Sequence, residues 1–266
     1  MQICHQVIKI AEEAGEKILG VYKKLTQGEQ ILQQQKKDHS PVTEADLLAH
    51  QLIENALIQA FPEIPILSEE QKEIPYEIRQ KWAQFWLVDP LDGTKDFLAQ
   101  NDEFTVNIAL IEKTVPILGV IHLPALEWTF FAKKGHGAFL KTKEGIQKLP
   151  GFIPEKNSIL VSRFHETESM AQFIQINQIT KMTRAGSALK FGKVALGEAM
   201  FYPRFVGSSE WDIAAGQIIV TESGGYLIDL STKKPPIYNK PSLRNAFFIA
   251  GASESEWEKL MIPKNF

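Results

Sequence analysis

Apolar residues near the start of the chain recur every three or four positions, the spacing of a helix with one buried face. The first such stretch runs from Val7 to Leu25, and a second follows Thr43 and ends before Pro62. Thr43 is a favoured helix cap, and proline is typical of a position just past a helix end. The polar run 27–37 between these stretches has weak periodicity. We therefore expect two amphipathic helices joined by a loop or a ragged helix end.

Short apolar runs then replace the helical pattern, as is typical of strands. The run 64–67 ends at Ser68-Glu69-Glu70, and the run 85–88 ends at Asp89, so acidic residues close both. Further strands are predicted at 104–111, 117–122 and 128–132, and the turn 133–137 leads into a hairpin partner at 138–141.

Helices and strands alternate after the segment 149–157, which carries prolines and a glycine, and this order favours a parallel or mixed sheet. We therefore predict an N-terminal lobe, 1–155, and a C-terminal lobe, 156–266. The strands expected in the second lobe are 159–161, 199–202 and 226–228, and the helices are 166–176, a run ending at Gly197, and 213–223.

Composition excludes several classes of protein. The 266 residues are 44% apolar and 23% charged, as in globular domains. A formal charge of −3 gives no general affinity for nucleic acid, so an anionic ligand requires a local binding site. The single Cys4 fits a reducing cytosol, and neither a signal peptide nor a membrane-spanning apolar run is recognisable. We expect a cytoplasmic protein.

The segment 89–94, DPLDGT, carries the candidate chemistry. Asp89, Asp92 and the carbonyl of Leu91 are oxygen ligands of the kind that hard cations prefer. Gly93 permits a tight turn, and free amides at a helix start after it would suit a phosphate. The same composition is also common in ordinary acidic turns, and considered alone it favours a turn.

Acidic residues elsewhere could join this segment. Glu69 follows a predicted strand, while Asp46 and Asp212 lie at predicted helix starts, where acids also complement the helix dipole without any ligand. Two carboxylates about 5 Å apart repel by roughly 3 kcal/mol at an effective dielectric constant near 20. Convergence would therefore require divalent cations or shifted pKa values. The spacing of the residues along the chain does not decide whether they converge.

Four motifs in order resemble the inositol monophosphatase superfamily, and most closely its bacterial CysQ-type 3'(2'),5'-bisphosphate nucleotidases. They are SPVTEAD (40–46), LSEE (67–70), DPLDGTKDF (89–97) and WDIAAG (211–216). The resemblance implies an α/β fold, a layered αβαβα sandwich, and hydrolysis of a phosphate monoester with two or three Mg²⁺ ions. It also implies lithium sensitivity and a monomer or homodimer. Peripheral association with the inner membrane is left open.

The resemblance assigns roles to individual residues. It implies metal ligation by Glu69, Asp89, Asp92, Asp212 and the Leu91 carbonyl, and catalysis by Thr94, Asp46 and Glu69. The expected substrate is adenosine 3',5'-bisphosphate, a by-product of sulfate assimilation, which would yield AMP and phosphate. Substrate contacts are expected from Glu69, Leu91, Asp92, Gly93, Thr94, Asp212, Gly186, Ser187, Lys190, His165 and Arg204.

Specificity depends on the second lobe. Gly186, Ser187 and Lys190 combine a glycine, a hydroxyl and a cation at a helix start, which favours an anion. For Arg204 and His165 the sequence leaves two alternatives open, contact with a ligand or a role in the fold alone. An inositol or sugar phosphatase of the same fold remains an alternative, as does a module that binds a phosphonucleotide without hydrolysing it. Binding alone would not require Thr94 and Asp46, which weighs against such a module.

Overall fold

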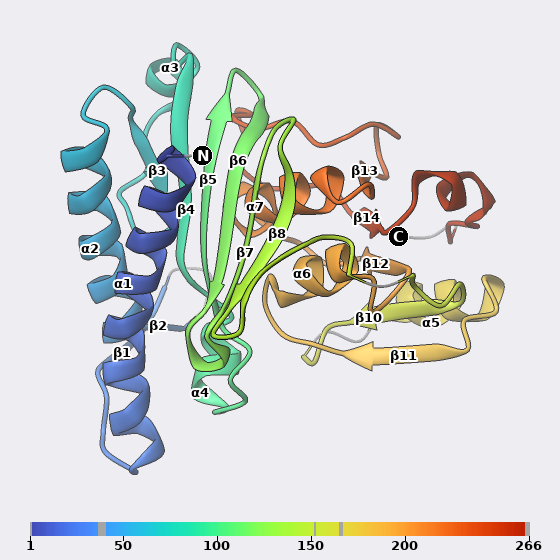
Figure 1. The fold of residues 1–266 in the computed structure, drawn as a ribbon, viewed down its shortest axis with the longest axis horizontal. Helices are drawn as coiled ribbons and strands as arrows, with labels where there is room; N and C mark the ends of the chain where they lie inside the picture. The colour runs from blue at the N-terminus through green and yellow to red at the C-terminus, as the bar shows by residue number, and fades with distance from the viewer. Residues whose placement is uncertain (1, 37–40, 152, 165–166, 264–266) are drawn as a thin grey trace.

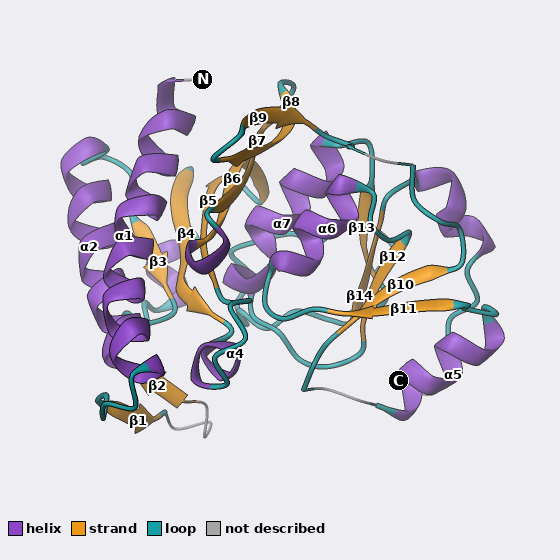
Figure 2. Ribbon diagram, turned by 60° about the horizontal axis from the view of Figure 1, so that its bottom comes forward, coloured by secondary structure: helices purple, strands orange, loops and turns teal. Residues whose placement is uncertain are grey.

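The computed structural model describes residues 2–36, 41–151, 153–164 and 167–263. Two helices, a seven-stranded sheet, two further helices, a five-stranded sheet and a last helix follow one another as layers (Figure 2). This arrangement confirms the predicted αβαβα sandwich. Within these residues no helix is both long and apolar enough to span a bilayer.

The first layer consists of α1 (Gln2–Thr26) and α2 (Glu44–Ala60), which pack against each other and against the larger sheet. The predicted cap is confirmed: Ala45 N donates to Thr43 Oγ1, and Thr43 N donates to Asp46 Oδ2 at 2.7 Å. The expectation for 27–37 was incomplete. Its residues 33–35 form a short strand, β1 (Gln33–Gln35), whose backbone pairs with β2 (Pro41–Thr43). All three β1 residues are exposed glutamines, so no apolar pattern predicts the strand.

The seven-stranded sheet has the order β3-β4-β5-β6-β7-β8-β9. Only the β3–β4 pair is parallel, which places the carboxyl ends of these two strands at the same edge. Helices cover both faces, and residues 85–88 are accordingly at most 1% exposed. The strands are β3 (Ile66–Ser68), β4 (Gln84–Asp92), β5 (Thr105–Glu112), β6 (Val115–Leu123), β7 (Trp128–Lys133), β8 (Gly137–Thr142) and β9 (Gly145–Lys148), with α3 (Tyr76–Arg79) between β3 and β4.

The five-stranded sheet has the order β11-β10-β12-β14-β13. Strand β10 pairs in parallel with β11 and β12, and β14 pairs antiparallel with β12 and β13, so the predicted mixed sheet is confirmed. Strands β9, β11 and β14 were not predicted. Strands β9 and β11 are largely exposed and polar, and β14 is a run of four residues without periodicity. The bounds are β10 (Ser158–Val161), β11 (Lys181–Arg184), β12 (Phe201–Arg204), β13 (Tyr226–Asp229) and β14 (Phe248–Gly251).

Helices α6 (Leu189–Leu196) and α7 (Glu210–Glu222) fill the space between the sheets (Figure 1), while α5 (Glu168–Ile176) covers the far face of the smaller sheet (Figure 2). Helix α7 begins three residues before the predicted start. One apolar core includes Leu87 and Ile121 of the larger sheet together with Leu160 and Leu227 of the smaller. Both sheets share this core. The division into two lobes at residue 155 stays a prediction.

Helix α7 lies directly against β6 at Gly119. A methyl group on Gly119 would stand 2.7 Å from the carbonyl oxygen of Ala215 and 2.6 Å from Cγ2 of Ile218. The first atom belongs to helix backbone, which cannot move aside as a side chain can. Gly119 therefore sets how closely α7 approaches the sheet.

We expect Gly119→Ala to lower the free energy of unfolding by about 1–3 kcal/mol, because the added methyl overpacks the α7–β6 contact. Gly20→Ala is the matched control: it lies on an exposed part of α1 with nothing near its added methyl, and there alanine stabilises a helix by up to about 1 kcal/mol. Denaturant unfolding measures both changes. Equal effects of the two substitutions would contradict the close-approach argument.

Candidate active site

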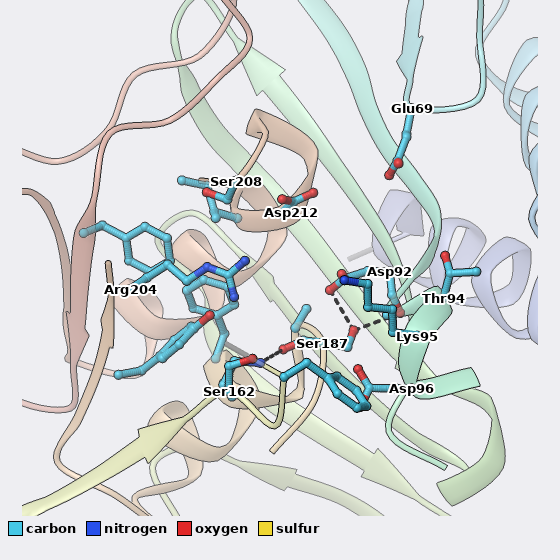
Figure 3. Close-up of a pocket in the computed structure, with 18 of the residues that line it drawn as sticks. Glu69, Asp92, Thr94, Lys95, Asp96, Ser162, Ser187, Arg204, Ser208 and Asp212 are labelled. Atoms are coloured by element: carbon cyan, nitrogen blue, oxygen red, sulfur yellow. Dashed lines mark hydrogen bonds between the residues drawn. The ribbon is translucent and has the colours of Figure 1, made fainter. Parts of the chain in front are cut away.

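Carboxylates from three separate elements meet where the parallel strands β3 and β4 end. Glu69 follows β3, Asp89 lies in β4, and Asp212 is the third residue of α7. One oxygen from each lies within 4.8 Å of the others. Asp92, at the end of β4, lines the same cavity as these three. Glu69, Asp92 and Asp212 also line an adjoining cavity, around which Figure 3 shows them. The structure thus answers the question that spacing left open.

Crowding and burial shift the proton affinities of this acidic cluster, Glu69, Asp89 and Asp212. Burial is the main cause that raises the pKa of Asp89 well above its usual value, and the neighbouring carboxylates add to the shift. Burial also raises the pKa of Asp212 to about 8, with help from the charges of Asp92 and Glu69. Burial is also the main cause that raises the pKa of Glu69. These oxygens suit a hard divalent cation, which would offset the repulsion, so the residues present fit the metal site that the motifs imply.

A hydroxyl and a carboxylate stand beside the cluster. Gly93 adopts the left-handed conformation (φ 83°) immediately before the short helix α4 (Thr94–Leu98). Thr94 Oγ1 donates to Asp46 Oδ1 at 3.2 Å and lies 3.4 Å from the carbonyl oxygen of Leu91. Burial raises the pKa of Asp46 to about 6, although hydrogen bonds from Thr43 oppose the shift. Thr94 is therefore oriented by Asp46 at the edge of the cluster.

Lys36 was missed by sequence reasoning. Its ammonium donates to Glu69 Oε1 at 2.7 Å and also contacts Glu70. Lys36 lies just after β1, within the polar run that was expected to be a loop, and only tertiary structure brings it to the acidic cluster. It supplies positive charge beside these carboxylates.

The first turn of α7, and with it Asp212, is held by a buried polar network that sequence reasoning also missed. Glu210 is fully buried and accepts hydrogen bonds from Asn239 N at 2.7 Å and Lys240 Nζ at 2.6 Å. Buried Arg79 donates to Asn239 Oδ1 at 2.9 Å and to the Lys240 carbonyl at 2.6 Å. The network ties the β13–β14 connection to the α7 start.

A second cavity adjoins the first, and Glu69, Asp92, Gly93, Thr94 and Asp212 line both. The groups predicted to receive a phosphate there have protein partners. Ser187 Oγ donates to Asp92 Oδ2 at 2.7 Å, as Figure 3 shows, and Gly186 N donates to Glu103 Oε2 at 2.7 Å. Lys190 Nζ donates to the carbonyls of Ser187 and Ala185, and burial lowers its pKa to about 8.

Arg204, at the end of β12, is better placed to meet an anion. It lines the second cavity, donates to the Gly207 carbonyl at 3.3 Å, and its buried Nε has no hydrogen-bond partner among the described residues. Exposed Lys95, for which the sequence analysis predicts no role, lines the same cavity. His165, the remaining predicted contact, lies outside the described residues.

A model of the inositol monophosphatase family matches residues 2–264. The chain belongs to this family. It is 40% identical to the 3'(2'),5'-bisphosphate nucleotidase CysQ of Salmonella typhimurium over 91% of this chain and 97% of the relative. Identity to CysQ of Escherichia coli K12 is 38% over the same shares.

Solved structures agree with the family assignment. CysQ of Bacteroides thetaiotaomicron superposes with a TM-score of 0.83 at 33% identity, covering 95% of this chain and 98% of that one. An inositol monophosphatase of Thermotoga maritima superposes with a TM-score of 0.78 at 26% identity, covering 97% and 95%. Inositol monophosphatase family members are in general metal-dependent, in keeping with the acidic cluster of this chain.

The raised pKa values predict how pH acts on the metal-free protein. Asp212 has an unfolded pKa of about 3.9 and a folded pKa of about 8. A raised folded pKa gives stability that is present at acidic pH and is lost as pH rises through the folded value. We therefore expect the melting temperature without metal to fall between pH 5 and pH 8, and Mg²⁺ to stabilise more at pH 8 than at pH 5.

Asp212→Asn tests the cause. At pH 8 without metal it should melt about 2–4 °C above wild type for each kcal/mol of repulsion removed, and it should lose most of the stabilisation by Mg²⁺. Glu144→Gln, at an exposed site, is the matched control and should follow wild type. A lower melting temperature for Asp212→Asn than for wild type at pH 8 would contradict the repulsion.

Proposed function

We propose that the protein hydrolyses the 3'-phosphate of adenosine 3',5'-bisphosphate to give AMP and phosphate, with Mg²⁺ as its cation. The observation that carries the proposal is the convergence of Glu69, Asp89 and Asp212 beside the Thr94–Asp46 hydrogen bond. Several relatives of the chain are named 3'(2'),5'-bisphosphate nucleotidases. We place the activity in the cytoplasm, where it would recycle a by-product of sulfate assimilation.

The acidic groups would hold Mg²⁺ through Glu69, Asp89, Asp92, Asp212 and the Leu91 carbonyl. Bound Mg²⁺ would neutralise the charge of the phosphate and favour attack by water on the phosphorus. The protein provides oxygens fixed at a strand end and a helix start, so little rearrangement is needed when the phosphate arrives.

Thr94 and Asp46 would position the attacking water. Asp46 Oδ2 accepts from Thr43 N and Thr43 Oγ1, at 2.7 and 2.6 Å, which leaves Oδ1 for the hydroxyl of Thr94. As that hydroxyl passes its own proton to Asp46 Oδ1, its oxygen can accept a proton from the attacking water. A threonine hydroxyl is a poor base alone, and the carboxylate makes the transfer feasible.

Arg204 would bind the 5'-phosphate. A guanidinium matches phosphate geometry, and this one lines the cavity next to Asp92 and Asp212. The acidic cluster itself serves an inositol phosphate equally well, so preference for a nucleotide with two phosphates must come from residues such as Arg204.

Phosphate release from three substrates separates the candidates. We expect adenosine 3',5'-bisphosphate to be hydrolysed much faster than inositol 1-phosphate, and Asp89→Asn to abolish both activities without unfolding the protein. Arg204→Gln should lower kcat/KM for the bisphosphate about tenfold or more, the value of a charge-assisted hydrogen bond, and leave adenosine 3'-phosphate unchanged. Equal rates with the bisphosphate and inositol 1-phosphate would overturn the substrate assignment.

Thr94→Val removes the hydroxyl and keeps the shape of the side chain. We expect kcat to fall about 10²–10⁴-fold, the usual contribution of a positioned proton-transfer group, with little change in KM. Thr94→Ser retains the hydroxyl and is the matched control, which should keep most of the activity. Comparable losses in both variants would show that the hydroxyl is not the group that matters.

A further inference from the structure

Glu103, just before β5, receives three hydrogen bonds from the layer of the smaller sheet. Arg163 donates through Nε to Oε2 at 2.5 Å and through a terminal nitrogen to Oε1 at 2.7 Å. Gly186 N donates to Oε2 at 2.7 Å. Arg163 follows β10 and Gly186 follows β11, and these parallel neighbours end at the same edge. One carboxylate therefore joins both connections to the larger sheet.

The segments that follow β10 and β11 both line the cavity next to the acidic cluster. Ser162 and Phe164 flank Arg163, and Ser187 follows Gly186; all three line that cavity. Glu103 lies in the larger-sheet half of the chain, so its hydrogen bonds fix the distance between these two segments and β5.

Ser187 has a conformation that needs outside support. Its φ is 46°, in the left-handed region that residues other than glycine rarely adopt. Such a conformation persists when surrounding contacts determine it. Here the contacts are the Gly186–Glu103 hydrogen bond, the Lys190 ammonium on the Ser187 carbonyl at 2.6 Å, and the Thr105 hydroxyl 2.6 Å from Ser187 Oγ.

The result of this conformation is a hydrogen bond to Asp92. Ser187 Oγ donates to Asp92 Oδ2 at 2.7 Å and lies 3.1 Å from the Asp92 carbonyl oxygen. A donor on one carboxylate oxygen fixes the rotation of the group and thus the direction of the other oxygen. Partners of this kind around metal ligands are worth about 10–100-fold in metal affinity or activity.

We propose that Glu103 is a positioning residue of the active site: by holding Gly186 and Arg163 it keeps Ser187 in its left-handed conformation, and through Ser187 it fixes the carboxylate of Asp92 for the cation. The inference rests on the proposed function, because it takes Asp92 as a Mg²⁺ ligand. It gives the residues 186–187 a role in orienting Asp92 in addition to any contact with substrate.

Mg²⁺ binding to the substrate-free protein, measured by calorimetry, tests the chain of contacts. We expect Glu103→Ala and Ser187→Ala each to weaken binding about tenfold. The double variant should be no weaker than the weaker single variant, because both changes break one chain. Glu103→Gln keeps an oxygen for Gly186 N and should stay within about threefold of wild type. Glu155→Ala, which breaks the exposed pair with Lys181, is the control and should bind as wild type does.

Two results would overturn the proposal: Mg²⁺ binding by Glu103→Ala equal to that of wild type, or a double variant whose loss equals the product of the single losses. Should Glu103→Ala fail to fold, Glu103→Asp serves in its place, because it keeps the charge and withdraws the oxygens from Gly186 N. Binding needs no substrate. A wild-type protein that binds Mg²⁺ and releases no phosphate from the nucleotide would therefore contradict the proposed function while this comparison still stands.

Discussion

Electrostatic repulsion within the acidic cluster is the constraint on which the site depends. Oxygens of Glu69, Asp89 and Asp212 lie within 4.8 Å of one another, and burial strengthens their repulsion because little water screens it. The protein holds them together by rigid means: a parallel strand pair brings Glu69 beside Asp89, and a helix start supplies Asp212. Lys36 offsets part of the charge through its contact with Glu69 at 2.7 Å. A divalent cation would offset the rest.

Helix α7 connects this constraint to the fold. Its middle fills the core shared by both sheets, at a distance that Gly119 sets, and its first turn carries Asp212. The buried Glu210 network holds that turn at its other side. Changes to the packing of α7 and changes to the cluster should therefore affect one another, because the same helix carries both.

Sequence alone predicts much of the fold and the identity of the acidic residues. The spacing from Val7 to Leu25 predicts α1, and the apolar run 85–88 predicts the middle of β4. It does not predict β11, whose residues are largely exposed. Nor does it predict the convergence of Glu69 with Asp212, which are 143 positions apart in the sequence (212 − 69). Lys36, Glu103 and Glu210 act through partners distant in sequence, so no local pattern reveals them. The phosphate contacts expected at Gly186, Ser187 and Lys190 stay predictions, because their polar groups have protein partners here.

The most direct measurement of the central claim is the number of protons released when Mg²⁺ binds at pH 7. Calorimetric titration in buffers of different ionisation enthalpy gives this number. Because Asp89 and Asp212 have raised pKa values in the metal-free protein, the cation must displace protons from the cluster. We expect net proton release at pH 7 that declines toward pH 9. Tight Mg²⁺ binding with no proton release at pH 7 would contradict the claim that repulsion among these carboxylates is what the cation relieves.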